Sequence, residues 1–169
     1  MNCNSFAGLV NLPAQTINAT AETLLVNAAA ATAQLNMPPA ANVNGHAFRV
    51  RLIGTATGGT SATLTLKFYL GVSASGTNIA AFTVSGAAIP AAGGNFDVNV
   101  ELIWDSVSQT VHGFKGGHTN GTLTTTAALD NSGASVVSAA GLTFVASATF
   151  GAALATNSVT VQEFSLEQV

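Results

Sequence analysis

Apolar and polar positions alternate most regularly between Asn95 and Trp104, where the sequence reads NFDVNVELIW. One parity is wholly apolar, and the other is polar as far as Glu101. Strict alternation with a period of two residues is typical of a strand that buries one face and exposes the other to water. The apolar parity includes the single tryptophan, so we expect Trp104 in the core rather than on a sugar-stacking surface. We expect the other strands to pack around this one.

Four further runs alternate in the same way and predict its main partners: residues 46–58, 61–73, 141–151 and 158–169. Gly58-Gly59, between the first two runs, predicts a hairpin or another tight antiparallel connection. In the last run the inward parity changes between Val161 and Phe164, which predicts a β-bulge near Gln162-Glu163. Weaker strands are expected within residues 15–27, 77–89, 110–115 and 122–128. Residues 28–33 fit a helical turn or an extended edge segment, and their strand-like flanks favour the extended form.

These runs predict an all-β protein: a jelly-roll-like antiparallel β-sandwich of about eight strands with an N-terminal arm. We expect the arm over residues 1–15 and a single domain over residues 16–169, long enough to bury a core. The arm carries Phe6, Leu9, Val10 and Leu12, which make it too apolar for a purely solvated tail. It therefore either packs on its own domain or binds a neighbour, and these four residues are candidate partner contacts.

Charged residues make up 7% of the chain, against about a quarter in typical soluble domains. Four scattered basic residues and a net charge of −3 argue against a nucleic-acid partner. The single cysteine excludes an intrachain disulfide framework, and the first residues lack the pattern of a secretory signal. No apolar run is long enough for a membrane helix. We expect synthesis in a cytoplasm, and the weakly charged surface suits a permanent assembly.

No group of residues has the spacing of a metal site. Asp105, His112 and His118 lack a recognised ligand pattern, so we expect no metal and no other cofactor. Tyr69 has the outward parity of its strand and is a candidate surface contact. The loop GGHTNG adds His118 and Asn120 as further candidate contacts, although glycine and asparagine are also what a plain turn requires.

Asp97 and Glu101 share the polar face of the central strand, as two carboxylates of a hydrolase would. Cross-strand ion pairs explain them more simply, because three of the four basic residues hold outward positions on other strands: Arg49, Arg51 and Lys67. There is also no G-x-S-x-G nucleophile motif. We therefore expect no catalytic residues and no enzymatic activity.

The succession of FRVRLIGTATGG, SATLTLKFYLG, NFDVNVELIWDS, TVHGFKGG, GLTFVASATFG and VTVQEFSLEQV resembles small all-β structural proteins of tailed bacteriophages. The better understood members of that group are jelly-roll capsid decoration, or cement, proteins. The likeness covers most of the chain from about residue 45 onward and rests on pattern and order. It implies a homotrimer seated on the outer capsid that clamps neighbouring major capsid subunits, often with help from an N-terminal arm. It supplies no catalytic residues.

The resemblance thus implies a non-enzymatic virion protein on the capsid surface, present in the host cytoplasm during assembly. Its expected partners are the major capsid protein and further copies of itself, with no nucleic acid and no membrane. An alternative is a carbohydrate- or receptor-binding jelly-roll module of a phage tail fibre or baseplate. Such a module would present an exposed aromatic patch or bind calcium.

Overall fold

The computed structural model describes residues 5–10, 12–25, 34–37, 47–58, 63–70, 77–84, 93–105, 110–118, 125–129, 134–135 and 142–169. For residues 5–7, 9–10, 36–37, 77–84, 104–105, 110–118, 125–129, 134–135 and 142 this description covers the backbone alone. Every regular element in these ranges is a β-strand. The same ranges contain no helix of the length and apolarity needed to cross a membrane.

The described residues form nine strands of at least five residues: β1 (Ser5–Val10), β5 (Ala47–Thr57), β6 (Leu64–Leu70), β7 (Thr77–Val84), β8 (Gly94–Asp105), β9 (Thr110–His118), β10 (Thr125–Leu129), β12 (Leu142–Phe150) and β13 (Ser158–Gln168). Four shorter strands complete the set: β2 (Gln15–Thr16), β3 (Thr23–Leu24), β4 (Gln34–Met37) and β11 (Ala134–Ser135). Apart from the arm strand β1, eight long strands remain, as the sequence predicted.

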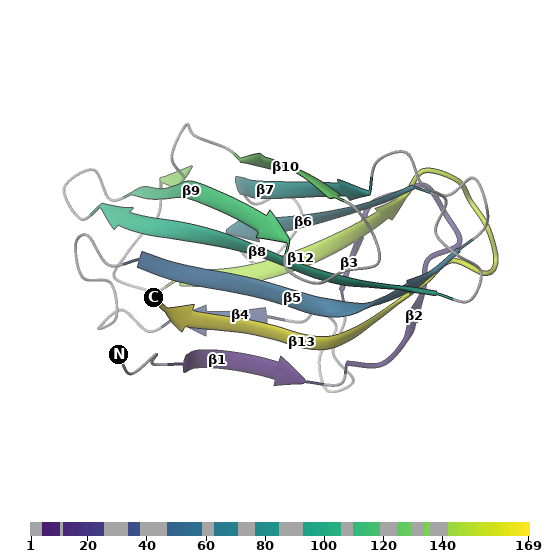
Figure 1. Cartoon of the computed structure of the whole chain (residues 1–169), viewed down its shortest axis with the longest axis horizontal. Coiled ribbons are helices and arrows are strands. Elements are labelled where there is room, and N and C mark those ends of the chain that lie inside the picture. The colour runs from purple at the N-terminus through teal and green to yellow at the C-terminus, as the bar shows by residue number, and fades with distance from the viewer. Residues whose placement is uncertain are drawn as a thin grey trace.

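These strands form two antiparallel sheets packed face to face (Figure 1). Sheet A has the order β1-β13-β5-β8-β9-β11, with β2 paired to β13. Sheet B has the order β10-β7-β6-β12-β3, with β4 paired to β12. In Figure 1, β13, β5 and β8 run across the front layer, and β12, β6 and β7 lie behind them. The predicted all-β, jelly-roll-like sandwich is therefore confirmed.

The core fills the space between the sheets and takes one parity from each long strand whose side chains are described. In β8 the residues Phe96, Val98, Val100 and Leu102 are at most 1% exposed, as the alternation predicted. The largest fully buried side chains are six phenylalanines from both sheets: Phe48, Phe68, Phe96, Phe144, Phe150 and Phe164. Aromatic and branched side chains from two inner faces thus supply most of the apolar burial that holds the sheets together.

The connection between β5 and β6 and the end of β9 differ from what the sequence predicted. The chain passes through Gly58-Gly59 from β5 in sheet A to β6 in sheet B, so the two strands do not form a hairpin. A glycine pair signals a reversal of direction, but it does not decide whether the chain returns in the same sheet or in the facing one. The strand β9 also runs on to His118, so the first half of the expected GGHTNG loop belongs to a strand.

The N-terminal segment docks on its own domain. β1 pairs antiparallel with β13 and forms one edge of sheet A among the described residues, with β11 at the opposite edge. The Leu12 N–H donates to the carbonyl oxygen of Val161, and the Leu12 side chain is 6% exposed. The single strand expected within residues 15–27 is wrong. β2 pairs with sheet A and β3 with sheet B, while Ile17 and Leu25 enter the core.

The predicted bulge in the last strand is confirmed. The register of β13 against β5 shifts between Val161 and Glu163. On either side of the shift, Val161 and Phe164 are both buried. One extra residue therefore resets the parity so that β13 keeps an apolar inner face along its whole length.

Candidate functional site: the charged outer face of sheet A

The described charged side chains gather on the outer faces of the two sheets. Of the eight charged residues whose side chains are described, six lie on the adjacent strands β13, β5 and β8, and we call this group the charged face: Arg49, Arg51, Asp97, Glu101, Glu163 and Glu167. Glu22 and Lys67 meet on sheet B. The rest of the surface whose side chains are described carries no charged side chain.

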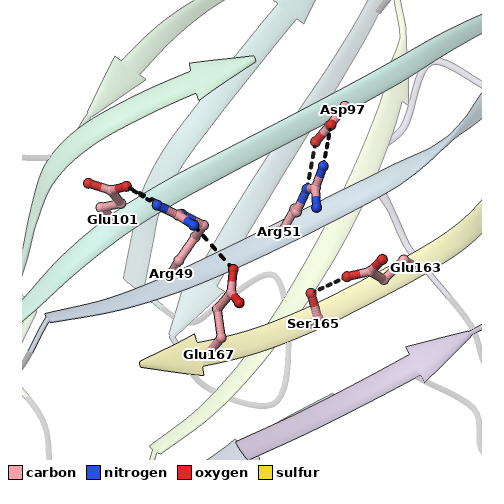
Figure 2. A network of polar contacts seen from close by, with 7 residues as sticks. All are labelled: Arg49, Arg51, Asp97, Glu101, Glu163, Ser165 and Glu167. Atoms are coloured by element: carbon pink, nitrogen blue, oxygen red, sulfur yellow. Dashed lines mark hydrogen bonds and ion pairs between the residues drawn. The ribbon is translucent and has the colours of Figure 1, made fainter. Parts of the chain in front are cut away.

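Strand register places charges of alternating sign in one row across sheet A. Glu167 lies opposite Arg49, Arg49 opposite Glu101, and Glu101 opposite Lys115. Arg49 Nη2 donates to Glu101 Oε1 at 2.7 Å, and Arg49 Nη1 donates to Glu167 Oε1 at 3.3 Å (Figure 2). Opposite charges at facing positions stabilise antiparallel strand pairs. One arginine thereby ties three strands together.

Arg51 binds Asp97 through two parallel hydrogen bonds (Figure 2). Its Nε donates to Oδ1 at 2.9 Å and its Nη2 to Oδ2 at 2.6 Å, the geometry of a strong, charge-assisted pair. The pair is diagonal, because Asp97 lies directly opposite Ile53 in the register. Asp97 is 5% exposed and Glu101 is 9% exposed. The expectation that these two carboxylates form ordinary solvated surface is therefore wrong, since the longer arginines lie beside them.

The hydrogen bond to Glu101 raises the pKa of Arg49 above its ordinary value, against the lowering effect of burial. The hydrogen bond to Asp97 raises the pKa of Arg51 in the same way. Both guanidinium groups therefore stay charged across the range in which proteins are stable. The predicted cross-strand ion pairs are confirmed for these two arginines.

Glu163 and Glu167 give the charged face an excess of negative charge. Glu163 Oε1 accepts a hydrogen bond from Ser165 Oγ at 2.6 Å (Figure 2). Four carboxylates against two guanidinium groups leave a formal charge of −2 on this face.

Lys67 does not pair with the carboxylates of sheet A, because it lies on sheet B. Its Nζ donates to Glu22 Oε2 at 3.1 Å, and Glu22 comes from the segment between β2 and β3. Tyr69 Oη and Ser147 Oγ both donate to Glu22 Oε1 at 2.5 Å. We call these four residues the Glu22 cluster. The expected partner of Lys67 was wrong because sequence alternation does not say which sheet a strand joins.

Several of the predicted contact residues lie elsewhere than expected. Tyr69 has the outward parity of β6, but the residue is 4% exposed and its hydroxyl group donates to Glu22, so it offers no exposed ring. Leu12 belongs to the core and not to a partner contact. The backbones of Phe6, Leu9 and Val10 lie in β1, and their side chains are outside the description.

For the remaining candidate residues, the structure describes the backbone alone or does not describe the residue. His118 ends β9 opposite Val98, in a strand rather than in the predicted loop. Asn120 lies outside the described residues. His112 pairs in register with Ile103, and Trp104 belongs to β8 by its backbone. The side chains of His112, His118 and Trp104 are outside the description, so their roles stay predictions.

The charged face is built to join strands and to present polar groups. Hydrogen bonds run between side chains of this face. Within the described residues, no three or more His, Cys, Asp or Glu side chains come together in a way that could hold a metal ion. What the face can do for another molecule is to offer hydrogen bonds and a modest negative charge.

Fold and surface together define an antiparallel β-sandwich whose described charged groups, apart from Glu163, form ion pairs with one another. The chain matches no model of a known protein family and no curated protein sequence. Among solved structures it is similar to the CBM2 module of the evolved Dit of Lactobacillus casei BL23 phage J-1, at 12% identity and with a TM-score of 0.34. The similarity covers 79% of this chain and 67% of that chain. Because this TM-score is low, the fold class rests on the strand pairing of this chain itself.

Proposed function

We propose that this protein is a non-enzymatic structural protein of a bacteriophage virion, a decoration protein that binds the outer surface of the major capsid lattice and stabilises the head. The resemblance of the strand runs to phage cement proteins supports the proposal. So does the all-β sandwich, whose described polar groups join strands to one another.

The edge of sheet A that β1 forms is the observation that carries the proposal. β1 is one of the two edge strands of that sheet among the described residues, and its sequence, SFAGLV, has neither a charge nor a proline. Exposed edge strands usually carry charges or proline, because their unpaired backbone groups would otherwise pair with other chains. The register irregularity between Ser5 and Ala7 interrupts one end and leaves Ala7 to Val10 in regular register. An edge with so little protection suits a protein that is covered in an assembly.

In a trimer, each such edge would be present three times in one rigid unit. Contacts that are individually modest then add up, because a second and third contact form within an already bound particle. The low charge of the chain, 7% of residues, also reduces repulsion between closely packed copies. A symmetric, multivalent clamp is the mechanism that we infer for head stabilisation.

The test uses capsids of the phage that encodes the chain, assembled without this protein. Full-length protein should co-sediment with them and raise the temperature at which they release DNA, and light scattering should give the mass of a trimer. The variant Gly8→Lys places a charge on the edge at a position with no neighbouring heavy atom within 4 Å of an added Cβ. It should fold normally and lose capsid binding.

Ala153→Lys is the matched control, because it adds the same charge at an exposed position in the segment between β12 and β13. This variant should bind capsids like the unmodified protein. Equal binding by Gly8→Lys would remove the edge from the interface. Failure of the unmodified protein to bind, together with a monomeric mass, would refute the decoration role.

A further inference from the structure

Three hydrogen-bond donors converge on one carboxylate at the outer face of sheet B. Lys67 and Tyr69 come from β6, and Ser147 comes from its neighbour β12. In the register, Ser147 lies directly opposite Lys67 and Tyr69 lies opposite Val145, so the three donors come from adjacent positions on two paired strands. The sheet therefore fixes their positions independently of the segment that carries Glu22.

The donors match the two oxygen atoms of a carboxylate. Two hydroxyl groups, those of Tyr69 and Ser147, donate to Oε1 of Glu22, and the Lys67 ammonium donates to Oε2. Ser147 is 0% exposed and Tyr69 is 4% exposed, although both lie on the outer side of the sheet. Buried hydroxyl groups need a partner, and Glu22 is the acceptor that both of these hydroxyl groups share.

Charge also favours a carboxylate at this position. Burial opposes ionisation of Glu22, but the hydrogen bonds from Ser147, Tyr69 and Lys67 outweigh it and lower the pKa of Glu22 below its ordinary value. Burial and the bond to Glu22 raise the pKa of Tyr69, which keeps its hydroxyl a donor. The Lys67 ammonium supplies the compensating positive charge.

Glu22 is delivered by a segment that crosses from one sheet to the other. The Ile17 N–H donates to the carbonyl oxygen of Asn157, and the Leu25 N–H donates to that of Ala146. Between these two attachments, the Glu22 side chain accepts hydrogen bonds from Lys67, Tyr69 and Ser147 on the outer face of sheet B. We call residues 18–25 the strap.

We propose that Lys67, Tyr69 and Ser147 form a carboxylate-binding site on the outer face of sheet B, and that Glu22 on the strap is its built-in ligand. The ligand class is a carboxylate with two accepting oxygens and one negative charge. The site is independent of the decoration role, because it rests on contacts within a single chain.

Acetate is the probe, used on the full-length variant Glu22→Ala at neutral pH with chloride at equal ionic strength as the reference. Acetate should raise the melting temperature of this variant by about 2–4 °C, the shift expected when the ligand is present at several times its dissociation constant. The unmodified protein should show no difference between the two salts, because Glu22 already fills the site. The double variant Glu22→Ala, Lys67→Met should also show none.

Glu163→Ala is the matched control on sheet A. It removes a carboxylate that accepts a hydrogen bond from the Ser165 hydroxyl group, so acetate should give this variant no advantage over chloride. A second measurement, the ultraviolet absorption of tyrosine, does not depend on stability. It reports on this site because Tyr69 is the single tyrosine of the chain. Acetate entering the site of Glu22→Ala should change the ultraviolet absorption of that tyrosine in a saturable way.

The possible results distinguish a carboxylate-binding site from contacts that only hold the strap in place. Acetate-specific stabilisation and a saturable tyrosine signal in Glu22→Ala, both absent after Lys67→Met, would support the site. If Glu22→Ala folds in acetate and not in chloride, that result supports it equally. Equal effects of acetate and chloride on Glu22→Ala, or equal stabilisation of Glu163→Ala by acetate, would overturn the proposal. The contacts of Glu22 would then only attach the strap to sheet B.

Discussion

Replacing Gly54 by alanine tests whether the close packing beside the bulge of β13 stabilises the fold. Gly54 lies on the inner parity of β5, opposite Phe96 in β8 and opposite Val161 in β13. A Cβ at this position would overlap the carbonyl oxygen of Thr160 and lie 2.7 Å from Cζ of Phe96. Real Cβ atoms do not approach heavy atoms so closely, so the β13 backbone or the ring must move.

The expected loss is about 1–3 kcal/mol, the usual range for overpacking a filled core. For a domain of this length each kcal/mol corresponds to about 2–4 °C in melting temperature, so we expect a decrease of about 2–12 °C. Urea unfolding followed by tryptophan fluorescence should give the free energy directly. The value should lie in the upper half of the range if the backbone at the bulge cannot shift.

Gly8→Ala is the matched control, because an added Cβ at Gly8 has no heavy atom within 4 Å. It should leave the stability unchanged within about 0.5 kcal/mol. The double variant Gly54→Ala, Phe96→Leu should recover part of the loss and not all of it, since the overlap with the Thr160 carbonyl remains. Equal stability of the Gly54→Ala and Gly8→Ala variants would refute the reasoning.

Three further predictions concern the charges and the arm. Arg51→Met should lower the free energy of unfolding, measured in urea, by about 1–2 kcal/mol, because Asp97 is left nearly buried without its partner. Lys67→Met should lower it by about 0–1 kcal/mol, because both members of its ion pair are about a quarter exposed. Equal losses in the two variants would contradict this reasoning. The pKa of Glu22 is lowered in the folded state, so its contribution should be complete above the ordinary value of 4.5 and disappear as pH falls through the folded-state pKa. The stability difference between the unmodified protein and Glu22→Gln should then shrink in acid, and a difference that stayed constant would count against the assignment. Deleting residues 1–15 should lower the free energy of unfolding by at least about 2 kcal/mol, because the burial of the Leu12 side chain is lost. Thermal unfolding measures this loss, and an unchanged melting temperature would show that the arm does not stabilise the domain.

The alternation of side chains predicted the strands well because burial of one face has a direct signature at a period of two residues. β5, β6, β8, β12 and β13 each lie within or close to a run chosen from the sequence. The bulge in β13 was also visible, since a change of inward parity within one strand needs an extra residue. Local geometry and solvent exposure are enough for such features.

Parity alone could not say how completely an outer face is covered. Asp97 and Tyr69 both have outward parity, and both are nearly buried. The Asp97 carboxylate accepts hydrogen bonds from an arginine of the next strand, and the Tyr69 hydroxyl donates to a glutamate that lies 47 residues earlier in the chain. Contacts of this kind depend on which strands become neighbours, and nothing in the local pattern of either residue records it.

The sequence by itself determined that this protein is all-β, where most of its long strands lie and which side chains of β5, β6, β8, β12 and β13 face the core, because these features follow from the short-range alternation of polar and apolar residues. Only the tertiary structure decided which sheet each strand joins, that the N-terminal arm docks on its own domain, and that Glu22 meets Lys67, Tyr69 and Ser147. These features arise from pairing between distant segments, where the free energy depends on how two whole faces fit together and not on the order of residues within either one.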